Sequence, residues 1–251
     1  MEMNRIASLQ SKWFIEFERN NVHNIYDRIA EHFTKTRYRI WPGVEQFLRQ
    51  RSPFDTVLDV GCGNGKNLIS HNHNLFCIGI DRCVPLVRTC KERQLETAVA
   101  DMLELPFQSE KFDVVLCIAV LHHLCTRERR ILAIQEMGRV LRQGGSCLLY
   151  VWAAEEKNGK DDVKNTKARE KMRFLDESKQ EALIPWVMIE HEKKTKATQL
   201  EDTVQHCTLE RYYHLYRQGE LEEECLQSNC FHIQHSYYEQ SNWCVVLNKK
   251  K

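Results

Sequence analysis

The chain has 251 residues, and its 36 basic and 35 acidic side chains leave a formal net charge of +1. This length is enough for one substantial α/β domain, and the balanced charge excludes a general attraction to nucleic acid, so any basic surface must be local. No apolar stretch reaches the roughly 18 residues of a membrane span. The first six residues lack a basic-then-apolar signal pattern, so we expect a cytoplasmic protein, or one shared between cytoplasm and nucleus.

The eleven cysteines are scattered along the chain, and no two form a CxxC pair. Several lie within apolar runs, as Cys117 does in Val115–Ile118. Such thiols are typical of reduced, buried residues that pack as small hydrophobes. Zinc sites usually show closely paired ligands, so we expect no metal site in this chain.

The N-terminal part, residues 7–50, has helical periodicity. Val22, Ile25, Ile29 and Phe33 recur at intervals of three and four residues. Trp41-Pro42 ends this pattern, and a second short helix is expected after it. We therefore assign residues 1–52 to an N-terminal helical extension.

Strands and helices then alternate through residues 53–154. The pattern predicts strands at 56–60, 75–80, 97–100, 112–118 and 146–152, with helices at 66–71, 85–93 and 127–141. Alternation of this kind requires a parallel sheet with helices on both faces. The carboxyl ends of the strands, and any ligand, should lie along one edge of the sheet.

The composition becomes charged and lysine-rich after residue 154. Residues 155–205 are expected to form a solvated insert or partly mobile loop, with one apolar island at 182–189. Residues 206–251 should complete the domain, with a helix through Leu221 and Cys225 and antiparallel strands at 231–237 and 243–247. The expected fold is a mostly parallel seven-stranded sheet with helices on both faces and an antiparallel C-terminal pair.

The most informative motif follows the first strand. Gly61, Gly63 and Gly65 alternate in a GxGxG pattern, which differs from the GxGxxG that places a pyrophosphate on a helix. Glycine tolerates positive φ and lets a ligand approach the backbone. Asp59 precedes the glycines and Asp81 ends the next strand. The combination resembles the S-adenosylmethionine (SAM) site of class I methyltransferases, which implies SAM as the cofactor.

Three aspartates at strand ends have roles in such a site. Asp81 is placed to accept hydrogen bonds from both ribose hydroxyls, and Asp101 from an adenine amino group, with Met102 against the base. Asp59 would lie near the cationic methionine portion, where an anion is favourable. Each aspartate alone could be an ordinary turn or cap residue. Their order on successive strands favours the cofactor role.

The exit of the fourth strand carries His122 and His123, in a region that lines the methyl-transfer site of class I methyltransferases. A neutral imidazole can donate or accept a hydrogen bond there, although a histidine with a purely structural role is the alternative for each.

Several blocks outside the glycine loop carry a narrower resemblance. These blocks resemble eukaryotic tRNA wobble-uridine carboxyl methyltransferases. At the N-terminal side they are residues 22–33, 36–38 and Trp41-Pro42, and at the C-terminal side 211–216, 219–221 and Asn242-Trp243. Residues 121–123 and 150–153 resemble the same family. The resemblance covers nearly the whole chain except the charged insert. The chain departs from the pattern at Val187, since relatives often have histidine after Pro-Trp.

This resemblance implies a substrate and a partner. The substrate would be the carboxylate of 5-carboxymethyluridine at tRNA position 34, which becomes a methyl ester. The partner would be a small zinc-binding activator subunit, and the open sheet edge near 97–100 is where we expect it to pair. Lysines and arginines of the insert, at 164, 167, 169, 171 and 173, are candidates for RNA contact, although nearby acids make a solvated loop equally plausible.

A carboxylate with a pKa of about 4 is already ionised at neutral pH, so no general base is needed. A cation must instead orient it. Arg37 is the first candidate and His122 the second, while Tyr26 is expected at the methionine end of SAM. The residues expected around the uridine are His123, Arg211, Tyr212 and His214. The alternatives are a small-molecule methyltransferase and a non-catalytic paralogue that binds SAM or a partner.

Overall fold

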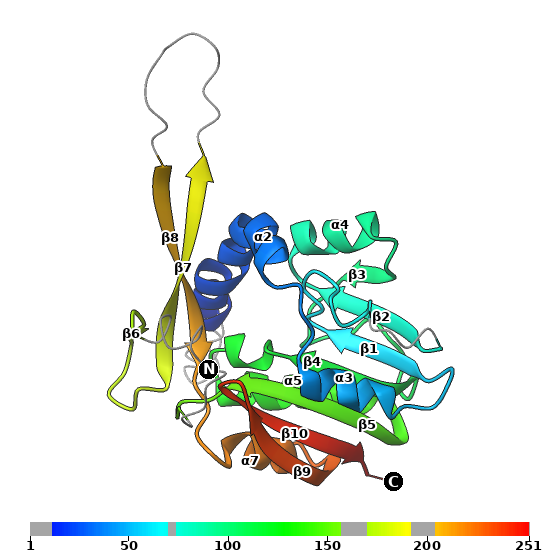
Figure 1. Cartoon of the computed structure of the whole chain (residues 1–251). Coiled ribbons are helices and arrows are strands. Elements are labelled where there is room, and N and C mark those ends of the chain that lie inside the picture. The colour runs from blue at the N-terminus through cyan, green and yellow to red at the C-terminus, as the bar shows by residue number, and fades with distance from the viewer. Residues whose placement is uncertain (1–11, 70–73, 157–169, 192–203, 251) are drawn as a thin grey trace.

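The computed structural model describes residues 12–69, 74–156, 170–191 and 204–250. Its centre is a seven-stranded sheet in the order β3-β2-β1-β4-β5-β10-β9 (Figure 1). The first five strands run parallel, and β10 pairs antiparallel with β5 and β9. The predicted fold class is thereby confirmed. The bounds are β1 Thr56–Val60, β2 Phe76–Asp81, β3 Thr97–Val99, β4 Phe112–Ile118, β5 Leu141–Trp152, β9 Phe231–Glu239 and β10 Asn242–Lys249.

Helices cover both faces of this sheet. On one face, α5 (Arg127–Val140) and α7 (Glu220–Gln227) bury Ile134, Met137 and Leu221 against the strands. On the other, α3 (Pro42–Arg49) buries Phe47 and Leu48. Proline at the first position of α3 is favourable, since that residue has no intrahelical donor to lose. The helix α4 (Val84–Glu92) lies between β2 and β3 in the chain.

Two predicted elements differ in extent. The expected helix at 66–71 is a series of turns up to residue 69, held by a hydrogen bond from Leu68 N to Gly65 O at 3.0 Å, and His71 lies outside the described residues. The strand expected to begin at residue 146 begins at Leu141 instead. Leu141 already pairs with β4, and the register shift before Ser146 is accommodated by Gly144, which adopts a φ of 71°.

The largest departure is in the insert. Its apolar island is strand β7 (Glu181–His191), which pairs antiparallel with β8 (Val204–His214) and with the short β6 (Arg173–Phe174). The expectation of a solvated loop is therefore wrong for these residues, and the boundary expected at 205–206 falls inside β8. Residues 157–169 and 192–203 of the expected insert lie outside the described part.

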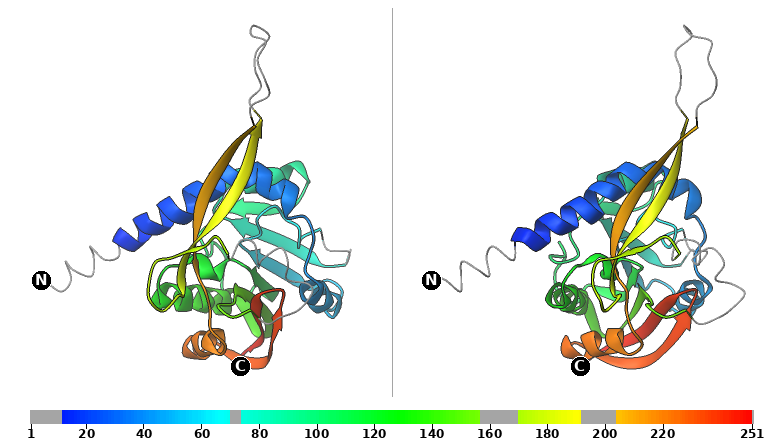
Figure 2. Two further views of the ribbon diagram at one scale, coloured as in Figure 1. Left: turned by 60° about the vertical axis from the view of Figure 1, so that its left-hand side comes forward. Right: turned by 90° about the vertical axis from the view of Figure 1, so that its left-hand side faces the viewer.

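The N-terminal helix packs against the hairpin. This helix runs from residue 12 to 36 and comprises a π-helical turn, η1 (Arg19–His23), and α2 (Asn24–Thr36). Ile29 packs with Trp186 and Leu209 of the hairpin. The long hairpin projects beyond the body of the molecule, with the helix alongside (Figure 2). Helix and hairpin together form a wall next to the carboxyl edge of the sheet. No helix among the described residues is long and apolar enough to cross a membrane.

Candidate active site

A cavity of about 1000 Å³ opens between the carboxyl ends of the strands, the N-terminal helix and the hairpin. It is large enough for two ligands of moderate size, since single ligand sites usually measure about 300–1000 Å³. Its wall is built by all three parts of the fold and includes Tyr26, Phe33, Arg37, Tyr38, Gly61, Gly63, Asn67, Asp81, Asp101, Met102, His123, Trp186, Arg211 and Tyr213.

The glycine loop forms the floor of the cavity. Gly61 and Gly63 have φ angles of 77° and 57°, in the left-handed region that favours glycine. A Cβ on Gly61 would overlap the side chain of Val120, whereas one on Gly63 would meet only Phe33, at 3.4 Å. Gly65, also at positive φ, supports the turn but does not line the cavity. The loop therefore needs Gly61 for space and leaves bare backbone exposed at Gly63.

Asp81 fixes this loop to the second strand. Its two carboxylate oxygens accept hydrogen bonds from the backbone N–H groups of Gly63 and Cys83, both at 2.8 Å. Burial raises the pKa of Asp81, while these donors oppose that shift. A carboxylate has about four acceptor sites, so two remain for a diol in the cavity. Its position is thus compatible with the expected ribose contact.

Asp59 lies fully buried behind the loop and does not line the cavity itself. It accepts a hydrogen bond from the side-chain amide of Asn67 at 3.1 Å, and Asn67 does line the cavity. Asp59 Oδ1 and Asn67 Oδ1 are both buried without a partner among the described residues. Burial raises the pKa of Asp59 to about 7. Two unpaired acceptors beside the floor fit a cationic ligand group such as an ammonium.

Asp101 and Met102 lie on the same wall as Asp81. The carboxylate of Asp101 accepts a hydrogen bond from Leu103 N at 3.0 Å and forms an ion pair with Arg82. Met102 is partly buried against the main core. The structure therefore brings both to the cavity, with Asp101 already in contact with a cation that sequence reasoning did not anticipate.

Two arginines approach the ring of Trp186 from different parts of the chain. The guanidinium carbon of Arg211 lies 4.6 Å from the ring centroid, and that of Arg37 lies 4.9 Å from it. Arg37 is held at the rim because its carbonyl accepts a hydrogen bond from the side chain of Asn64 at 3.0 Å. Arg211 is 5% exposed, and its Nε has no partner among the described residues. Neither arginine has a carboxylate within ion-pair distance in that part of the chain.

A chain of hydrogen bonds leads from Arg211 into the protein. Arg211 Nη1 donates to Tyr26 Oη at 3.2 Å, and Tyr26 Oη lies 2.9 Å from His123 Nε2. His123 Nδ1 lies 2.8 Å from the carbonyl of Tyr212, which can only accept. The network therefore assigns the proton of His123 to Nδ1, and Tyr26 donates to Nε2. Burial lowers the pKa of His123 to about 3, so the imidazole is neutral.

His122 does not reach the cavity wall. Its ring is fully buried and stacks on Tyr213 at 4.5 Å, while its Nδ1 accepts from Trp152 N at 3.2 Å. Burial lowers its pKa well below the ordinary value. Its Nε2 has no partner among the described residues, but it lies behind Tyr213. This placement does not support direct contact between His122 and a substrate.

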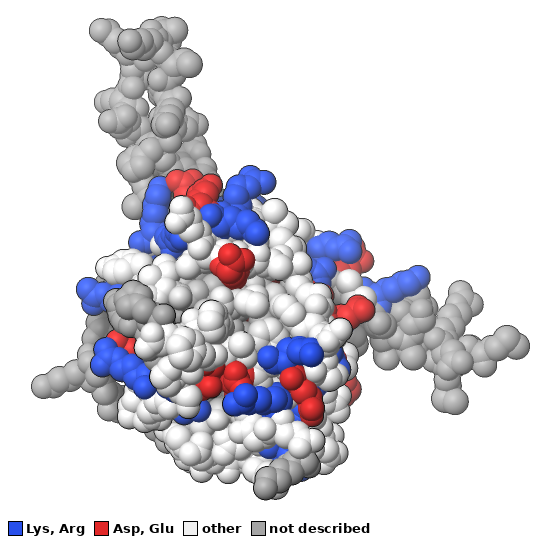
Figure 3. All heavy atoms as spheres, turned by 90° about the vertical axis from the view of Figure 1, so that its right-hand side faces the viewer, with Lys and Arg blue, Asp and Glu red and all other residues white. Residues whose placement is uncertain are grey.

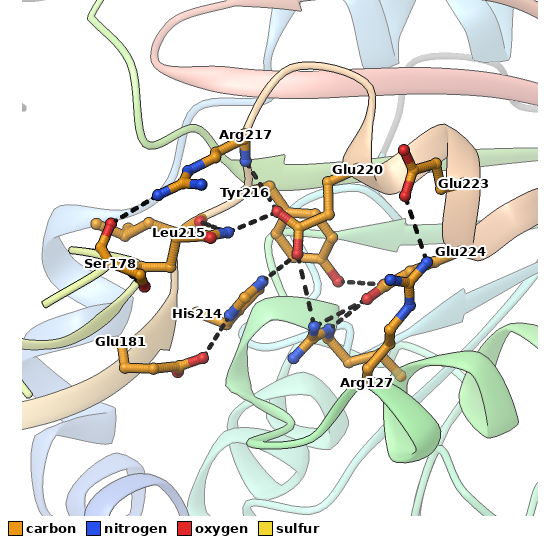
Figure 4. A network of polar contacts seen from close by, with 12 residues as sticks. Arg127, Ser178, Glu181, His214, Leu215, Tyr216, Arg217, Glu220, Glu223 and Glu224 are labelled. Carbon is orange, nitrogen blue, oxygen red and sulfur yellow. Dashed lines mark hydrogen bonds and ion pairs between the residues drawn. The ribbon is translucent and has the colours of Figure 1, made fainter. Parts of the chain in front are cut away.

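Tyr212 and His214 point away from the cavity, because β8 is a strand and its side chains alternate. Tyr212 Oη donates to Glu181, and His214 lies 2.8 Å from Glu181 and 2.7 Å from Glu220. Figure 4 shows His214 between Glu181 of the hairpin and Glu220 of α7. Glu224, also in α7, forms an ion pair with Arg130 at 2.8 Å and accepts a hydrogen bond from Tyr216. Neither Tyr212 nor His214 lines the cavity, whereas Tyr213, which lies between them in the strand, does.

Several wall residues had no predicted role in the site, among them Phe33, Asn67, Trp186 and Tyr213. Period-two alternation from Arg211 would have indicated Tyr213. Trp186 stands in the continuous apolar run at 182–189, which has no alternation that would indicate it. Nothing comparable marks Asn67, whose role depends on the buried neighbour Asp59.

The surface charge is mixed. Basic and acidic side chains are interspersed over the face that Figure 3 shows. Of the basic residues proposed for RNA contact, Arg173 forms an ion pair with Glu210 at 2.9 Å, and positions 164, 167 and 169 lie outside the described residues. No group of three or more His, Cys, Asp or Glu in the described part could hold a metal ion.

Comparisons with known proteins match this geometry. Residues 58–149 match the family model described as a methyltransferase domain. A tRNA (carboxymethyluridine(34)-5-O)-methyltransferase of Schizosaccharomyces pombe is 37% identical over 239 residues, which cover 94% of this chain and 99% of the relative. The chain belongs to this family. The Xenopus tropicalis tRNA (carboxymethyluridine(34)-5-O)-methyltransferase alkbh8 is 38% identical, and the match covers 92% of this chain but only 41% of that relative.

Solved structures similar to this member of the tRNA carboxymethyluridine methyltransferases share its fold. One is described as a complex between the Trm112 methyltransferase activator of Haloferax volcanii and a methyltransferase. It has a TM-score of 0.61 at 14% identity and covers 92% of this chain and 98% of the matched chain. At this identity the similarity shows the fold alone.

Proposed function

We propose that this chain transfers the methyl group of SAM to the carboxylate of 5-carboxymethyluridine at tRNA position 34, giving the methyl ester. The names of its relatives support the substrate. The observation that carries the proposal is the pair of guanidiniums, Arg37 and Arg211, beside Trp186 in a cavity with the floor of a SAM site. Two like charges near one ring repel each other, and a bound carboxylate between them would remove that repulsion.

The cofactor site would consist of the glycine loop, Asp81, Asp101 and Asn67. Asp81 would accept from the ribose hydroxyls, and Asn67, held by Asp59, from the ammonium of the methionine portion. Asp101 and Met102 would border the adenine. When bound, SAM supplies an electrophilic methyl group on a sulfonium.

The remaining residues orient the substrate. A carboxylate is already ionised at neutral pH, so the enzyme must hold one of its oxygens about 3–3.5 Å from the methyl group, in line with the breaking bond. Arg211, with Nε free to donate, can bind the other oxygen, and Arg37 can reach the anion from the rim. Tyr26 and the neutral His123 keep Arg211 in place through their hydrogen bonds. No residue has to accept a proton.

The product provides a direct test. The chain is incubated with labelled SAM and a stem–loop RNA that carries 5-carboxymethyluridine in its loop, and the RNA is then treated with mild alkali. A methyl ester is hydrolysed and releases the label, whereas a methyl group on carbon, nitrogen or ribose oxygen is retained. We expect alkali-labile label on the carboxymethyl RNA and none on the same RNA with uridine. Alkali-stable label would contradict the proposal.

We also propose that a small activator subunit pairs with the open edge of β3. Val99 on this edge is 52% exposed, and among the described residues β3 pairs only with β2. An exposed edge strand with apolar side chains is a template for strand addition. The Val99→Asp variant should lose binding of a co-expressed activator of the Trm112 type while it still binds SAM. Retained association would place the partner elsewhere.

A further inference from the structure

The rim of the cavity carries an exposed aromatic side chain whose function the methyl-transfer chemistry leaves unexplained. Tyr38 is 63% exposed and lines the cavity. Other exposed aromatic residues of the described part, such as Trp13, Phe54 and Phe76, do not line it. An isolated exposed aromatic is ordinary, so the case for a function depends on how Tyr38 is held.

The backbone on both sides of Tyr38 is anchored. On one side, the carbonyl of Arg37 accepts the hydrogen bond from Asn64 in the glycine loop. On the other, Trp41 stacks on Tyr150 with centroids 5.3 Å apart and an interplanar angle of 11°. The short segment between α2 and α3 therefore keeps the Tyr38 ring at a defined place over the cavity mouth, although the ring itself is largely in solvent.

The guanidinium of Arg39 lies beside the ring of Tyr38. Its guanidinium carbon lies 5.7 Å from the Tyr38 centroid, and no carboxylate of the described residues lies within ion-pair distance of it. Arg39 also lines the cavity and is exposed. An exposed ring beside an unpaired guanidinium has the chemistry that single-stranded nucleic acid requires, a surface for a base and a charge for a phosphate.

The size of the cavity limits how much of an RNA strand can enter it. A volume of about 1000 Å³ can hold the cofactor and one nucleoside, so the nucleotides next to the target must stay outside. A base taken out of its stack breaks contacts with its neighbours, and the enzyme has to replace them. We propose that Tyr38 stacks against the nucleobase adjacent to the target nucleotide, while Arg39 contacts the phosphate between them. This inference rests on the proposed function, because it presumes an RNA loop as substrate.

Binding of RNA can be measured apart from turnover. The test uses fluorescence anisotropy with a labelled stem–loop RNA that carries 5-carboxymethyluridine, and the variants Tyr38→Ala, Tyr38→Phe and Phe54→Ala. Phe54 is the matched control, since it is 69% exposed but lies outside the cavity wall. Loss of one stacked base predicts a rise in Kd of roughly 5- to 150-fold for Tyr38→Ala. Tyr38→Phe and Phe54→Ala should bind within about twofold of the wild type, because neither removes a stacking ring from the rim.

A second RNA identifies the stacked base. Removal of the base on one side of the target, leaving an abasic site, should weaken binding by the wild type but not further weaken Tyr38→Ala, since both changes remove the same contact. For Arg39→Ala, the dependence of log Kd on log salt should become shallower by about 0.7, the value for one phosphate on a single strand.

Equal Kd values for Tyr38→Ala and Phe54→Ala would overturn the inference. It would also be overturned if the abasic site and Tyr38→Ala weakened binding additively, whichever side of the target carried the abasic site. SAM affinity should be unchanged in every variant. Failure of the proposed function has a different signature: the wild type would then bind the stem–loop without forming alkali-labile label.

Discussion

Asn67 donates its side-chain amide to Asp59, and the contact leaves an acceptor oxygen of each residue buried without a partner in the described part of the chain. Unpaired buried acceptors are costly, typically about 1–3 kcal/mol each. The cost is reduced when a cationic donor binds beside them. We therefore predict that the pair couples cofactor binding to the charge of the Asp59 carboxyl group, whose burial raises its pKa to about 7.

SAM affinity should consequently depend on pH. Below pH 7 the Asp59 carboxyl is protonated and no longer attracts an ammonium, so we expect affinity to fall as the pH is lowered from about 8 to 6. Isothermal titration calorimetry at several pH values measures this. The ligand's own amine titrates as well, but equally for every variant. Asp59→Asn should bind more weakly and show a flatter profile, and an unchanged slope would exclude Asp59 as the titrating group.

The two arginines should affect methyl transfer and not cofactor binding. Removing a donor to a reacting anion typically costs about 10²–10³ in rate. We expect losses of this order in kcat/KM for Arg211→Ala and Arg37→Ala, with SAM affinity within a few fold. Arg211→Lys should recover only part, because an ammonium cannot bind a carboxylate in the bidentate manner. Arg51→Ala is a suitable control, since that guanidinium packs on Phe47 outside the cavity. Full turnover by Arg211→Ala would remove Arg211 from the mechanism.

Gly61 and Gly144 allow strain and crowding to be separated. Both have positive φ, of 77° and 71°, but a Cβ would overlap Val120 at Gly61 and meets nothing within 4 Å at Gly144. Gly144→Ala should cost only the backbone strain, about 1–2 kcal/mol. Gly61→Ala should lower the free energy of unfolding further and weaken SAM binding. Chemical denaturation and calorimetry give the two quantities, and equal losses of stability would contradict the predicted crowding at Gly61.

The contacts of His214 predict that the free energy of unfolding depends on pH. Burial alone would lower its pKa, but the contacts with Glu181 and Glu220 outweigh burial and raise it. A histidine with a raised pKa in the folded state stabilises fully below its unfolded value of about 6.5, and the contribution is lost as the pH rises through the folded pKa.

The variant His214→Gln should therefore lose about 2 kcal/mol at pH 6, or roughly 4–8 °C in Tm, and less at pH 9. His235→Gln, at an exposed position of β9, serves as the comparison. A loss that is the same at both pH values would mean that His214 acts as a neutral hydrogen-bonding group.

The sequence was sufficient for the sheet and for most of the cavity floor, because both depend on local signals. Apolar runs predict buried parallel strands, and Gly61 and Gly63 indicate a turn with the positive φ angles that favour glycine. The contact between Asp59 and Asn67 could not be predicted, since it depends on a turn where a helix was expected.

The hairpin was missed for a different physical reason. Strand β7 is apolar on the face that meets the N-terminal helix. In the sequence it lies within a charged segment, and the composition of the whole segment indicated a solvated loop. Long-range packing, such as that of Ile29 on Trp186, decides its structure, and no local signal reports such a contact. Because strand alternation was not applied to the segment after Leu209, Tyr212 and His214 were expected at the site together with Arg211, whereas Arg211 and Tyr213 line the cavity.

Strand β8 carries two sets of side chains with separate tasks on its two faces. Arg211 and Tyr213 face the cavity, whereas Tyr212 and His214 contact Glu181 of β7, and His214 also joins the hairpin to Glu220 of α7. Deleting one residue within this strand would exchange the sets: the anchors would face the cavity and the guanidinium would face the carboxylates. Insertions and deletions here should therefore be tolerated only in pairs, so that the length of this strand is a constraint on the enzyme as strict as the identity of its arginine.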